Sequence, residues 1–318
     1  KRSAVKISYN ADGQPISKEA GIVNGTTDAD WAAFSSQQQA TTNYDSNGGK
    51  ASEVITAGGV TYGVTQYSYD IAGRLDCTAV RMNSAQWASL PPSACTPQTT
   101  GSAGADRITK LGYDAINRVN KVTGAYGTGD QSDERTVTYT ISDKAQTETD
   151  ARGNITTYTY DGFDRLVARA FPSKTVTGNS AACTIGTIAE ATDGFGNTVA
   201  GPSETRTAGD DCEKYAYDRN GNRATLMKRD GNVIRYAYDA LNRNTVKDIP
   251  GGTAADVYYG YNLGGLLTFA RFVSASGLGI SNTYDGLGRL SSTTNNMGFA
   301  PLALGYLYDA DGNRIRIT

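Results

Sequence analysis

The sequence contains no histidine among its 318 residues, and this absence limits the chemistry that the chain can perform. Without imidazole, neither a Ser-His-Asp triad nor a Cys-His pair can form, and most transition-metal sites lose their commonest ligand. Aspartate and glutamate remain for acid–base chemistry, but no unique cluster of them stands apart from a repeated motif. We therefore expect no catalytic residue, no cofactor and no enzymatic activity.

An excess of charge and long apolar runs are missing as well. Lys and Arg number 30 against 32 Asp and Glu, so the net charge of −2 provides no basic surface for a nucleic acid. No run of about 18 apolar residues is present, so we expect no membrane insertion. The chain starts at Lys1 without Met or a signal-peptide pattern, and both ends lie in repeat-like sequence. We therefore expect a piece of a longer protein.

Tyrosine is abundant, and ten of the 20 tyrosines begin copies of one motif. The clearest copy reads Tyr-Asp-Gly-Leu-Gly-Arg-Leu at 284–290. In two copies the motif is interpreted as one residue longer, because its arginine is Arg223 or Arg314. A repeat of this kind defines the fold before any other feature does. The ten motif tyrosines are Tyr9, Tyr44, Tyr69, Tyr113, Tyr160, Tyr217, Tyr238, Tyr261, Tyr284 and Tyr308.

The fourth residue after each motif tyrosine is always glycine, asparagine or aspartate, the residues that best tolerate positive φ. The Asp that follows most motif tyrosines can start a turn, and a type I turn followed by a left-handed residue makes a three-residue hairpin loop with a bulge. Each copy therefore predicts the tip of a β-hairpin. The fourth residues are Gly13, Gly48, Gly73, Asn117, Asp164, Gly221, Asn242, Gly265, Gly288 and Gly312.

From Tyr217 onward the copies are spaced 21, 23, 23 and 24 residues apart, which leaves room for two strands and two turns. The second turn is predicted at 150–154 and 230–232, and a strand is predicted at 136–141. The fold class is therefore all-β, with repeated hairpins forming one long antiparallel sheet. We expect a single array over residues 1–318, since each unit of a repeat packs only on its neighbours.

Three insertions interrupt the repeats, at about 27–40, 77–106 and 173–211. The first two each contain a tryptophan in a short predicted helix, at 28–34 and 83–90. Cys77 and Cys95 bracket one insertion, and Cys183 and Cys212 bracket another, so we predict a disulfide in each and an oxidising compartment outside the cytosol. The alternative is four unrelated buried thiols. A zinc site is not expected, because there is no Cys-x-x-Cys.

The motif Tyr-Asp-x-x-Gly-Arg-Leu, preceded by Tyr-x-Tyr, resembles the YD repeat of Rhs proteins, bacterial wall-associated proteins, toxin-complex B and C components and teneurins. The resemblance runs from about Tyr9 to Arg314. It implies a spiralling β-sheet and a non-enzymatic, secreted or cell-surface scaffold, part of a shell that encloses or displays a partner such as a toxin domain. Its partners would be other parts of the same longer chain or further copies. The self-cleaving Asp-Pro-x-Gly-type motif of Rhs shells is absent, and so is a toxin domain.

The alternative function is an extracellular structural or adhesive element, a fibre or surface layer built by end-to-end or edge-to-edge association. In this alternative, the motif arginines and the neighbouring tyrosines would form an aromatic and basic stripe that binds glycans. The other interpretation of the same arginines is that they brace neighbouring hairpins through cation–π contacts and ion pairs. Two motifs, beginning at Asp218 and Asp309, also resemble the start of a calcium loop, but the turn explains the same residues. The stripe residues considered are Tyr236, Tyr238, Arg243, Tyr306, Tyr308 and Arg314.

Overall fold

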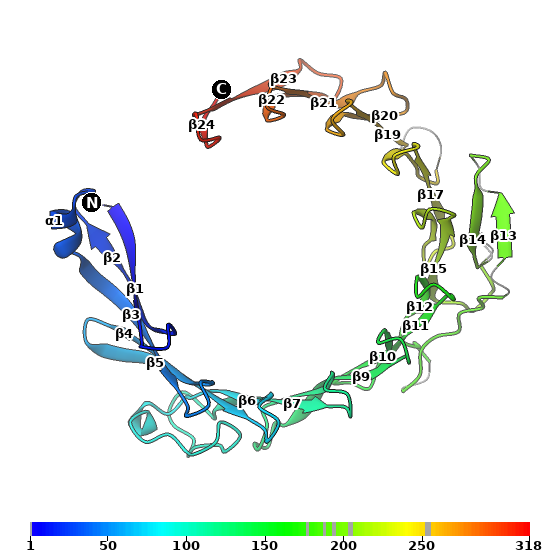
Figure 1. Cartoon of the computed structure of the whole chain (residues 1–318). Coiled ribbons are helices and arrows are strands. Elements are labelled where there is room, and N and C mark those ends of the chain that lie inside the picture. The colour runs from blue at the N-terminus through cyan, green and yellow to red at the C-terminus, as the bar shows by residue number, and fades with distance from the viewer. Residues whose placement is uncertain (1, 176–177, 187–188, 193–194, 203–205, 252–255) are drawn as a thin grey trace. The chain divides into compact units, whose positions relative to one another are not determined.

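The computed structural model in Figure 1 describes residues 2–175, 178–186, 189–192, 195–202, 206–251 and 256–318. The described chain is almost entirely β-strand, so the predicted all-β fold is confirmed. The elements are β1 (Arg2–Tyr9), β2 (Pro15–Val23), α1 (Asp28–Ala32), β3 (Ser35–Tyr44), β4 (Lys50–Ala57), β5 (Val60–Tyr69), β6 (Leu75–Val80), η1 (Ser84–Gln86, a 3-10 helix), β7 (Arg107–Tyr113), β8 (Val119–Gly124), β9 (Ser132–Tyr139), β10 (Ala145–Asp150), β11 (Ile155–Tyr160), β12 (Leu166–Ala170), β13 (Ala189–Thr192), β14 (Thr198–Gly201), β15 (Cys212–Asp218), β16 (Arg223–Met227), β17 (Val233–Tyr238), β18 (Asn244–Asp248), β19 (Val257–Tyr261), β20 (Leu267–Phe272), β21 (Gly279–Tyr284), β22 (Leu290–Asn296), β23 (Leu302–Tyr308) and β24 (Arg314–Ile317).

The chain forms two compact units, a division that the predicted single array did not include. One unit is Lys1–Tyr139 with Glu148–Gly153, and the other is Thr140–Thr147 with Asn154–Thr318. In the first unit, each strand from β1 to β9 pairs antiparallel with the next. In the second, β11 pairs with β12, β12 with β15, and each strand from β15 to β24 with the next. Both units are therefore built from the same antiparallel hairpins.

Each hairpin has a β-bulge at its motif tyrosine. Thr283 is opposite Ser292 but Tyr284 is opposite Leu290, so Ser291 is the extra residue. The same shift in register occurs at the other nine motif tyrosines. All ten of the fourth residues have positive φ, from 59° at Asp164 to 85° at Gly221. This is the geometry of a three-residue hairpin loop, in which a left-handed residue follows a type I turn.

An eleventh tip follows Tyr139, where the sequence predicted a strand through 136–141. β9 ends at Tyr139, and Asp143, four residues later, has φ 63°. Thr140 takes the place of the usual Asp, and its hydroxyl accepts a hydrogen bond from the Lys144 N–H at 3.1 Å. The predicted strand was therefore wrong over its last two residues.

The sequence predicts that the motifs at Tyr217 and Tyr308 are one residue longer than the others. This prediction is wrong, because the structure gives them the same length as the other copies. Tyr217 is opposite Arg223 just as Tyr160 is opposite Leu166, so the two loops have the same length. Asn222 occupies the position that arginine holds in most copies. The arginine of this variant lies one position later, on the following strand.

The insertions differ in extent from the predictions. β3 begins at Ser35, so the first strand-free segment is 24–34; it holds α1, whose N-terminus is closed by a capping box between Thr27 and Asp30. β6 continues to Val80, so the second insertion is 81–106, and its predicted helix is one 3-10 turn. The third insertion, after β12, contains the hairpin β13–β14, and β14 pairs with the end of β15.

Fully buried side chains are few because most of the chain is a sheet of half-polar strands. The one cluster of buried hydrophobic residues among the described residues combines Cys77, Ala79 and Ile108 on strands with Ala94 on the second insertion. The insertion therefore covers the sheet there. No helix of the described chain is long and apolar enough to cross a membrane.

Candidate functional site

The aspartate after the motif tyrosine organises each tip. One carboxylate oxygen of Asp285 accepts from the backbone N–H groups of Leu287 and Arg289 at 3.0 and 2.9 Å, and the other accepts from Arg289 Nε at 2.7 Å. Hydrogen bonds from the Arg289 side chain and backbone lower the pKa of Asp285. The same side-chain pair is present at Asp70–Arg74, Asp114–Arg118, Asp161–Arg165 and Asp239–Arg243.

The arginine held in this way lies over the motif tyrosine of the next hairpin. The Arg289 guanidinium carbon is 4.6 Å from the centre of the Tyr308 ring, within the range of a cation–π contact. Five tips are thus each joined to the next by a planar cation that the aspartate of the same tip orients. The equivalent contacts are Arg74 over Tyr113 at 4.3 Å, Arg118 over Tyr139 at 4.2 Å, Arg165 over Tyr217 at 4.6 Å and Arg243 over Tyr261 at 4.8 Å.

The hydroxyl of the motif tyrosine makes a second contact with the preceding hairpin. It donates to the backbone carbonyl that lies six residues after the preceding motif tyrosine. Burial raises the pKa of Tyr217, Tyr238 and Tyr261, which keeps these hydroxyls protonated as donors. We call this series of bonds the tyrosine ladder. Its members are Tyr44 to Pro15, Tyr69 to Lys50, Tyr113 to Leu75, Tyr139 to Val119, Tyr160 to Ala145, Tyr217 to Leu166, Tyr238 to Arg223, Tyr261 to Asn244, Tyr284 to Leu267 and Tyr308 to Leu290, at 2.6 to 3.2 Å.

The residues of the predicted stripe make contacts within hairpins and between them. Tyr238 and Tyr308 belong to the tyrosine ladder, and Arg243 pairs with Asp239. The remaining three lie in or beside cation–π contacts: Arg314 lies over Tyr306 at 5.6 Å, and Arg223 lies over Tyr236 at 4.9 Å. The Tyr238 and Tyr308 hydroxyls and the Arg223–Tyr236 contact join neighbouring hairpins, whereas the Arg314–Tyr306 contact lies within one hairpin. Glycan binding by the stripe stays a prediction.

The aspartates that resemble calcium ligands make turn contacts. Asp218 accepts from the backbone of Asn220 and Asn222 at 3.0 and 2.8 Å, and from the Asn222 side chain at 2.8 Å. Asp309 accepts in the same way from the Asn313 backbone and side chain, at 2.8 and 3.1 Å. Both carboxylates are therefore engaged in the hydrogen bonds of their turns.

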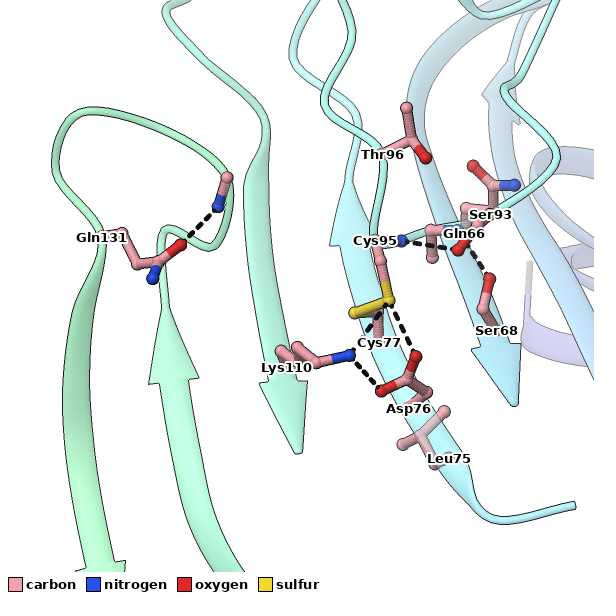
Figure 2. Close-up of a disulfide and its surroundings, with 12 residues drawn as sticks. Gln66, Ser68, Leu75, Asp76, Cys77, Ser93, Cys95, Thr96, Lys110 and Gln131 are labelled. Carbon is pink, nitrogen blue, oxygen red and sulfur yellow. Dashed lines mark hydrogen bonds and ion pairs between the residues drawn. A yellow bond between two sulfur atoms is a disulfide. The ribbon is translucent and has the colours of Figure 1, made fainter. Parts of the chain in front are cut away.

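Disulfides join the two cysteine pairs that the sequence suggested. Cys77 bonds to Cys95 with an S–S distance of 2.07 Å, and Cys183 bonds to Cys212 at 2.14 Å. Cys77 is completely buried, while Cys95 is half-buried. The Lys110 ammonium lies 2.6 Å from Asp76 Oδ1 and 3.9 Å from Cys95 Sγ. Figure 2 shows Lys110 and Asp76 beside this disulfide. This disulfide fastens the second insertion to β6.

A buried ion pair inside the second insertion could not be recognised in the sequence. Arg81 is only 1% exposed, and its guanidinium donates to Asp106 at 2.7 Å, to the Gln66 side chain and to two loop carbonyls. Burial alone would raise the pKa of Asp106, but N–H groups of Met82 and Gln98 and the Arg81 guanidinium outweigh it and lower the pKa. The pair thereby closes the loop from both ends.

The third insertion is closed by a looser arrangement. Asp210 accepts from the Thr184 N–H at 2.9 Å and lies 3.7 Å from the ammonium of Lys214. Its neighbour Asp211 receives two hydrogen bonds of 2.6 Å from Arg229. The Arg229 side chain lowers the pKa of Asp211 to about 2. In both insertions, then, an aspartate just before the next strand holds the loop.

A cavity of about 420 Å³ lies where two tips meet the inserted hairpin of the second unit. Its lining includes Phe163, Arg165, Val199, Tyr217 and Asn220. Arg165 is already paired with Asp161 and lies over Tyr217, so its charge is neutralised within the tip. The cavity has room for a small ligand.

Residues 143–176 match the family model described as RHS Repeat, which confirms the predicted resemblance for this segment. No curated protein matches the chain. Among solved structures, the chain is similar to the crystal structures of TcdB2-TccC3-Cdc42 (TM-score 0.46, 14% identity, 99% of this chain and 18% of that one) and of TcdB2-TccC3 (0.48, 16%, 98% and 16%). The chain is also similar to the structure of the Photorhabdus luminescens Tc holotoxin pore, with a TM-score of 0.29 and 13% identity, covering 98% of this chain and 20% of that one. The chain thus spans only 16% to 20% of these structures.

Proposed function

We propose that this chain is part of a secreted or cell-surface β-scaffold of the Rhs type, forming part of a shell that encloses or displays a partner. The tyrosine ladder is the observation that carries the proposal. Ten successive hydroxyls bind the preceding hairpin in one geometry, although the intervening segments differ in length. A contact of this kind extends a wall of sheet without needing a separate core.

The scaffold acts without catalysis in this proposal. The Asp, Arg and Tyr side chains of a typical tip are used in its turn, in the ion pair and in the contact with the next hairpin, as at 284–290. No polar group of the motif is therefore left for acid–base work. A toxin domain is the kind of partner that the resemblance to Rhs proteins favours, and it would come from outside the 318 residues.

The disulfides support an oxidising location. Both link an inserted loop to a buried cysteine on a strand, Cys77 on β6 or Cys212 on β15. Disulfides of this structural kind persist in extracellular compartments and are rare in the reducing cytosol. We therefore place the scaffold outside the cell or on its surface.

Electron microscopy of the natural, untruncated protein tests the proposal. Discrete hollow particles with density inside, together with a segment that resists protease until the particles are opened, are the expected result. Solid particles, or a protein whose every segment is cleaved at the same rate as an exposed loop, would refute enclosure.

The second candidate is a structural or adhesive element. The exposed apolar side chains along the hairpin ends favour it, since such side chains mark interaction surfaces. Continuous filaments or sheets in the same micrographs would select this function instead.

A further inference from the structure

The aspartate of one tip, Asp45, differs from every equivalent aspartate in its side-chain contacts. Eight tips carry an aspartate directly after the motif tyrosine. In seven of them its Oδ2 accepts a hydrogen bond from the side chain four residues later, which is arginine in five tips and asparagine in two. In the tip 44–50 this position is Gly49, which has no side chain to donate. The seven aspartates are Asp70, Asp114, Asp161, Asp218, Asp239, Asp285 and Asp309.

The turn uses only one oxygen of Asp45. Oδ1 accepts from the backbone N–H groups of Asn47 and Gly49 at 2.9 and 2.8 Å, as in the other tips. No group in the described part of the chain donates to Oδ2. The adjacent cation, Lys50, pairs with Glu53 instead of Asp45. Asp45 therefore keeps a negative charge and an acceptor oxygen that a ligand can use.

A cavity of about 550 Å³ lies beside Asp45, between this tip and the next. Its lining includes Tyr69, which is the motif tyrosine of the next tip, and Ile71. A Cβ added at Gly49 would be 2.7 Å from Asp45 Oδ2 and 2.8 Å from Tyr69 Cε2, so the carboxylate and the ring lie against the same glycine. The cavity therefore presents a carboxylate oxygen and an aromatic ring side by side.

The other tips show which ligand fits this combination. In five of them a guanidinium donates from Nε to Oδ2 of its aspartate at 2.7 or 2.8 Å. The same guanidinium lies 4.2 to 4.8 Å from the ring of the next motif tyrosine. Because a guanidinium is planar, it can pair with a carboxylate along its edge while its face stacks on a ring, which an ammonium cannot do. Asp45 and Tyr69 are the two protein groups of this arrangement, without the arginine.

We propose that the cavity binds the arginine side chain of a partner polypeptide. The guanidinium donates to Asp45 Oδ2 and stacks on Tyr69, in the way that Arg74 uses the equivalent groups one tip later. The cavity is larger than one guanidinium, so the apolar stem of the arginine packs on Ile71, whose side chain is exposed. The site goes beyond the proposed scaffold function and does not depend on a closed shell.

Titration of the 318-residue chain, followed by nuclear magnetic resonance, tests the site. The probe is N-acetyl-arginine amide, which represents an arginine within a polypeptide. It should shift the amide resonance of Gly49, whose N–H donates to Asp45 Oδ1, and it should bind in the millimolar range because water reaches the pair. N-acetyl-citrulline amide has nearly the same shape without the charge, and N-acetyl-lysine amide has the charge without the plane. Each should bind at least about tenfold more weakly.

Two variants and a control locate the site on Asp45. Asp45→Asn keeps the turn, since Asn10 and Asn262 hold their tips with the same side-chain oxygen, and it should weaken binding of the arginine probe at least about tenfold. Gly49→Arg supplies a guanidinium from within the chain, at the position where five other tips have one, and should abolish binding. Asp12→Asn, which removes an exposed carboxylate from the preceding tip, is the matched control and should bind like wild type.

Several results would overturn the proposal. These are equal binding of the arginine and lysine probes, wild-type affinity in Asp45→Asn, and an arginine probe that shifts no resonance of the tip 44–50. Circular dichroism spectra equal to wild type show that the variants are folded, and Asp45→Asn decides the question alone if Gly49→Arg does not fold. A failed titration leaves the proposed shell intact, and solid particles in the micrographs leave this site intact, so the two proposals fail separately.

Discussion

A regular hairpin tip and an inserted loop use the same kinds of charged residue in different surroundings. At the tip 284–290, the side chains of Asp285 and Arg289 are 28% and 29% exposed, and the same Asp–Arg pair recurs at four other tips. In the loop 81–106, the side chains of Arg81 and Asp106 are 0% and 1% exposed, and the pair joins the two ends of the loop. The charges are similar, but water reaches only the first pair.

This difference in exposure determines how much stability each region loses when one partner of its ion pair is removed. An exposed ion pair contributes little, and its loss leaves both charges hydrated. A buried pair contributes little net free energy while intact, but removal of one partner leaves an uncompensated charge in a medium of low dielectric constant. Stability is therefore shared among many small contacts in the repeats and concentrated in a few residues in the insertions.

Removing the carboxylate of the buried pair should have the largest effect. Asp106→Asn leaves the Arg81 guanidinium buried without a counter-charge, and the loss of unfolding free energy should be about 3–5 kcal/mol. Chemical denaturation monitored by circular dichroism measures it. Asp285→Asn at an exposed tip is the matched control and should shift the midpoint only slightly. Equal shifts in the two variants would show that Arg81 is not isolated from water.

The two disulfides should come next. Chain-entropy arguments give about 3 kcal/mol for either loop, slightly more for the longer one between Cys183 and Cys212. Cys77, however, lies in the buried cluster and Cys95 anchors a packed loop. We expect Cys77→Ala/Cys95→Ala to lower the thermal midpoint more than Cys183→Ala/Cys212→Ala. The reverse order would mean that the length of the closed loop, and not the packing around the cysteines, decides how much each disulfide contributes to stability.

A left-handed position in a tip should tolerate a β-branched residue poorly. Gly288 has φ 76°, and the nearest neighbour of an added Cβ would be 3.5 Å away, so the penalty of Gly288→Val comes from the backbone and not from a clash. It should be about 1–3 kcal/mol. Ser291→Val, three residues further along the same hairpin, is the control in thermal unfolding. A control that loses as much as the Gly288 variant would remove the basis for the tip assignment.

The tips were predictable from the sequence because their chemistry is local. A residue that tolerates positive φ must stand four positions after the motif tyrosine, and an oxygen-bearing side chain must follow that tyrosine directly. Where Thr140 replaced aspartate and Ile141 followed, the same turn was mistaken for a strand, since both residues are typical of strands. The turn was still signalled by Asp143, which has φ 63°.

The insertions were predictable only as interruptions. Nothing near Arg81 in the sequence indicates that Asp106, 25 residues later, will neutralise it, because the partner is chosen by the packing of the loop on the sheet. The cysteine pairs could be suggested because a disulfide constrains which residues meet. The length of the variant tip with Asn222 could not be predicted from the position of its arginine. The register of the hairpin defines the loop length, and in that register Tyr217 is opposite Arg223.

A single bond of the tyrosine ladder should contribute modestly. Tyr113→Phe keeps the ring under Arg74 and removes only the hydroxyl that donates to the Leu75 carbonyl at 2.7 Å. The expected loss of unfolding free energy is about 1 kcal/mol. Tyr62→Phe, at a tyrosine that is 66% exposed, should change nothing measurable. If the two variants unfold alike, the hydroxyls do not join the hairpins, and the proposed wall loses its main support.

The smallest expected effect is the acid dependence of the third insertion, at the partly exposed pair of Asp211 and Arg229. Asp211 has its pKa lowered from 3.8 to about 2 by Arg229, so the folded state favours the ionised carboxylate. This contribution is fully present above about pH 4 and is lost as the pH falls toward 2. Because Arg229 is 43% exposed, we expect less than about 1 kcal/mol. The difference in unfolding free energy between wild type and Asp211→Asn should therefore shrink as the pH is lowered through this window. A difference that stays constant would show that the pair does not favour the charged state, and that the disulfide and Asp210 hold the insertion without it.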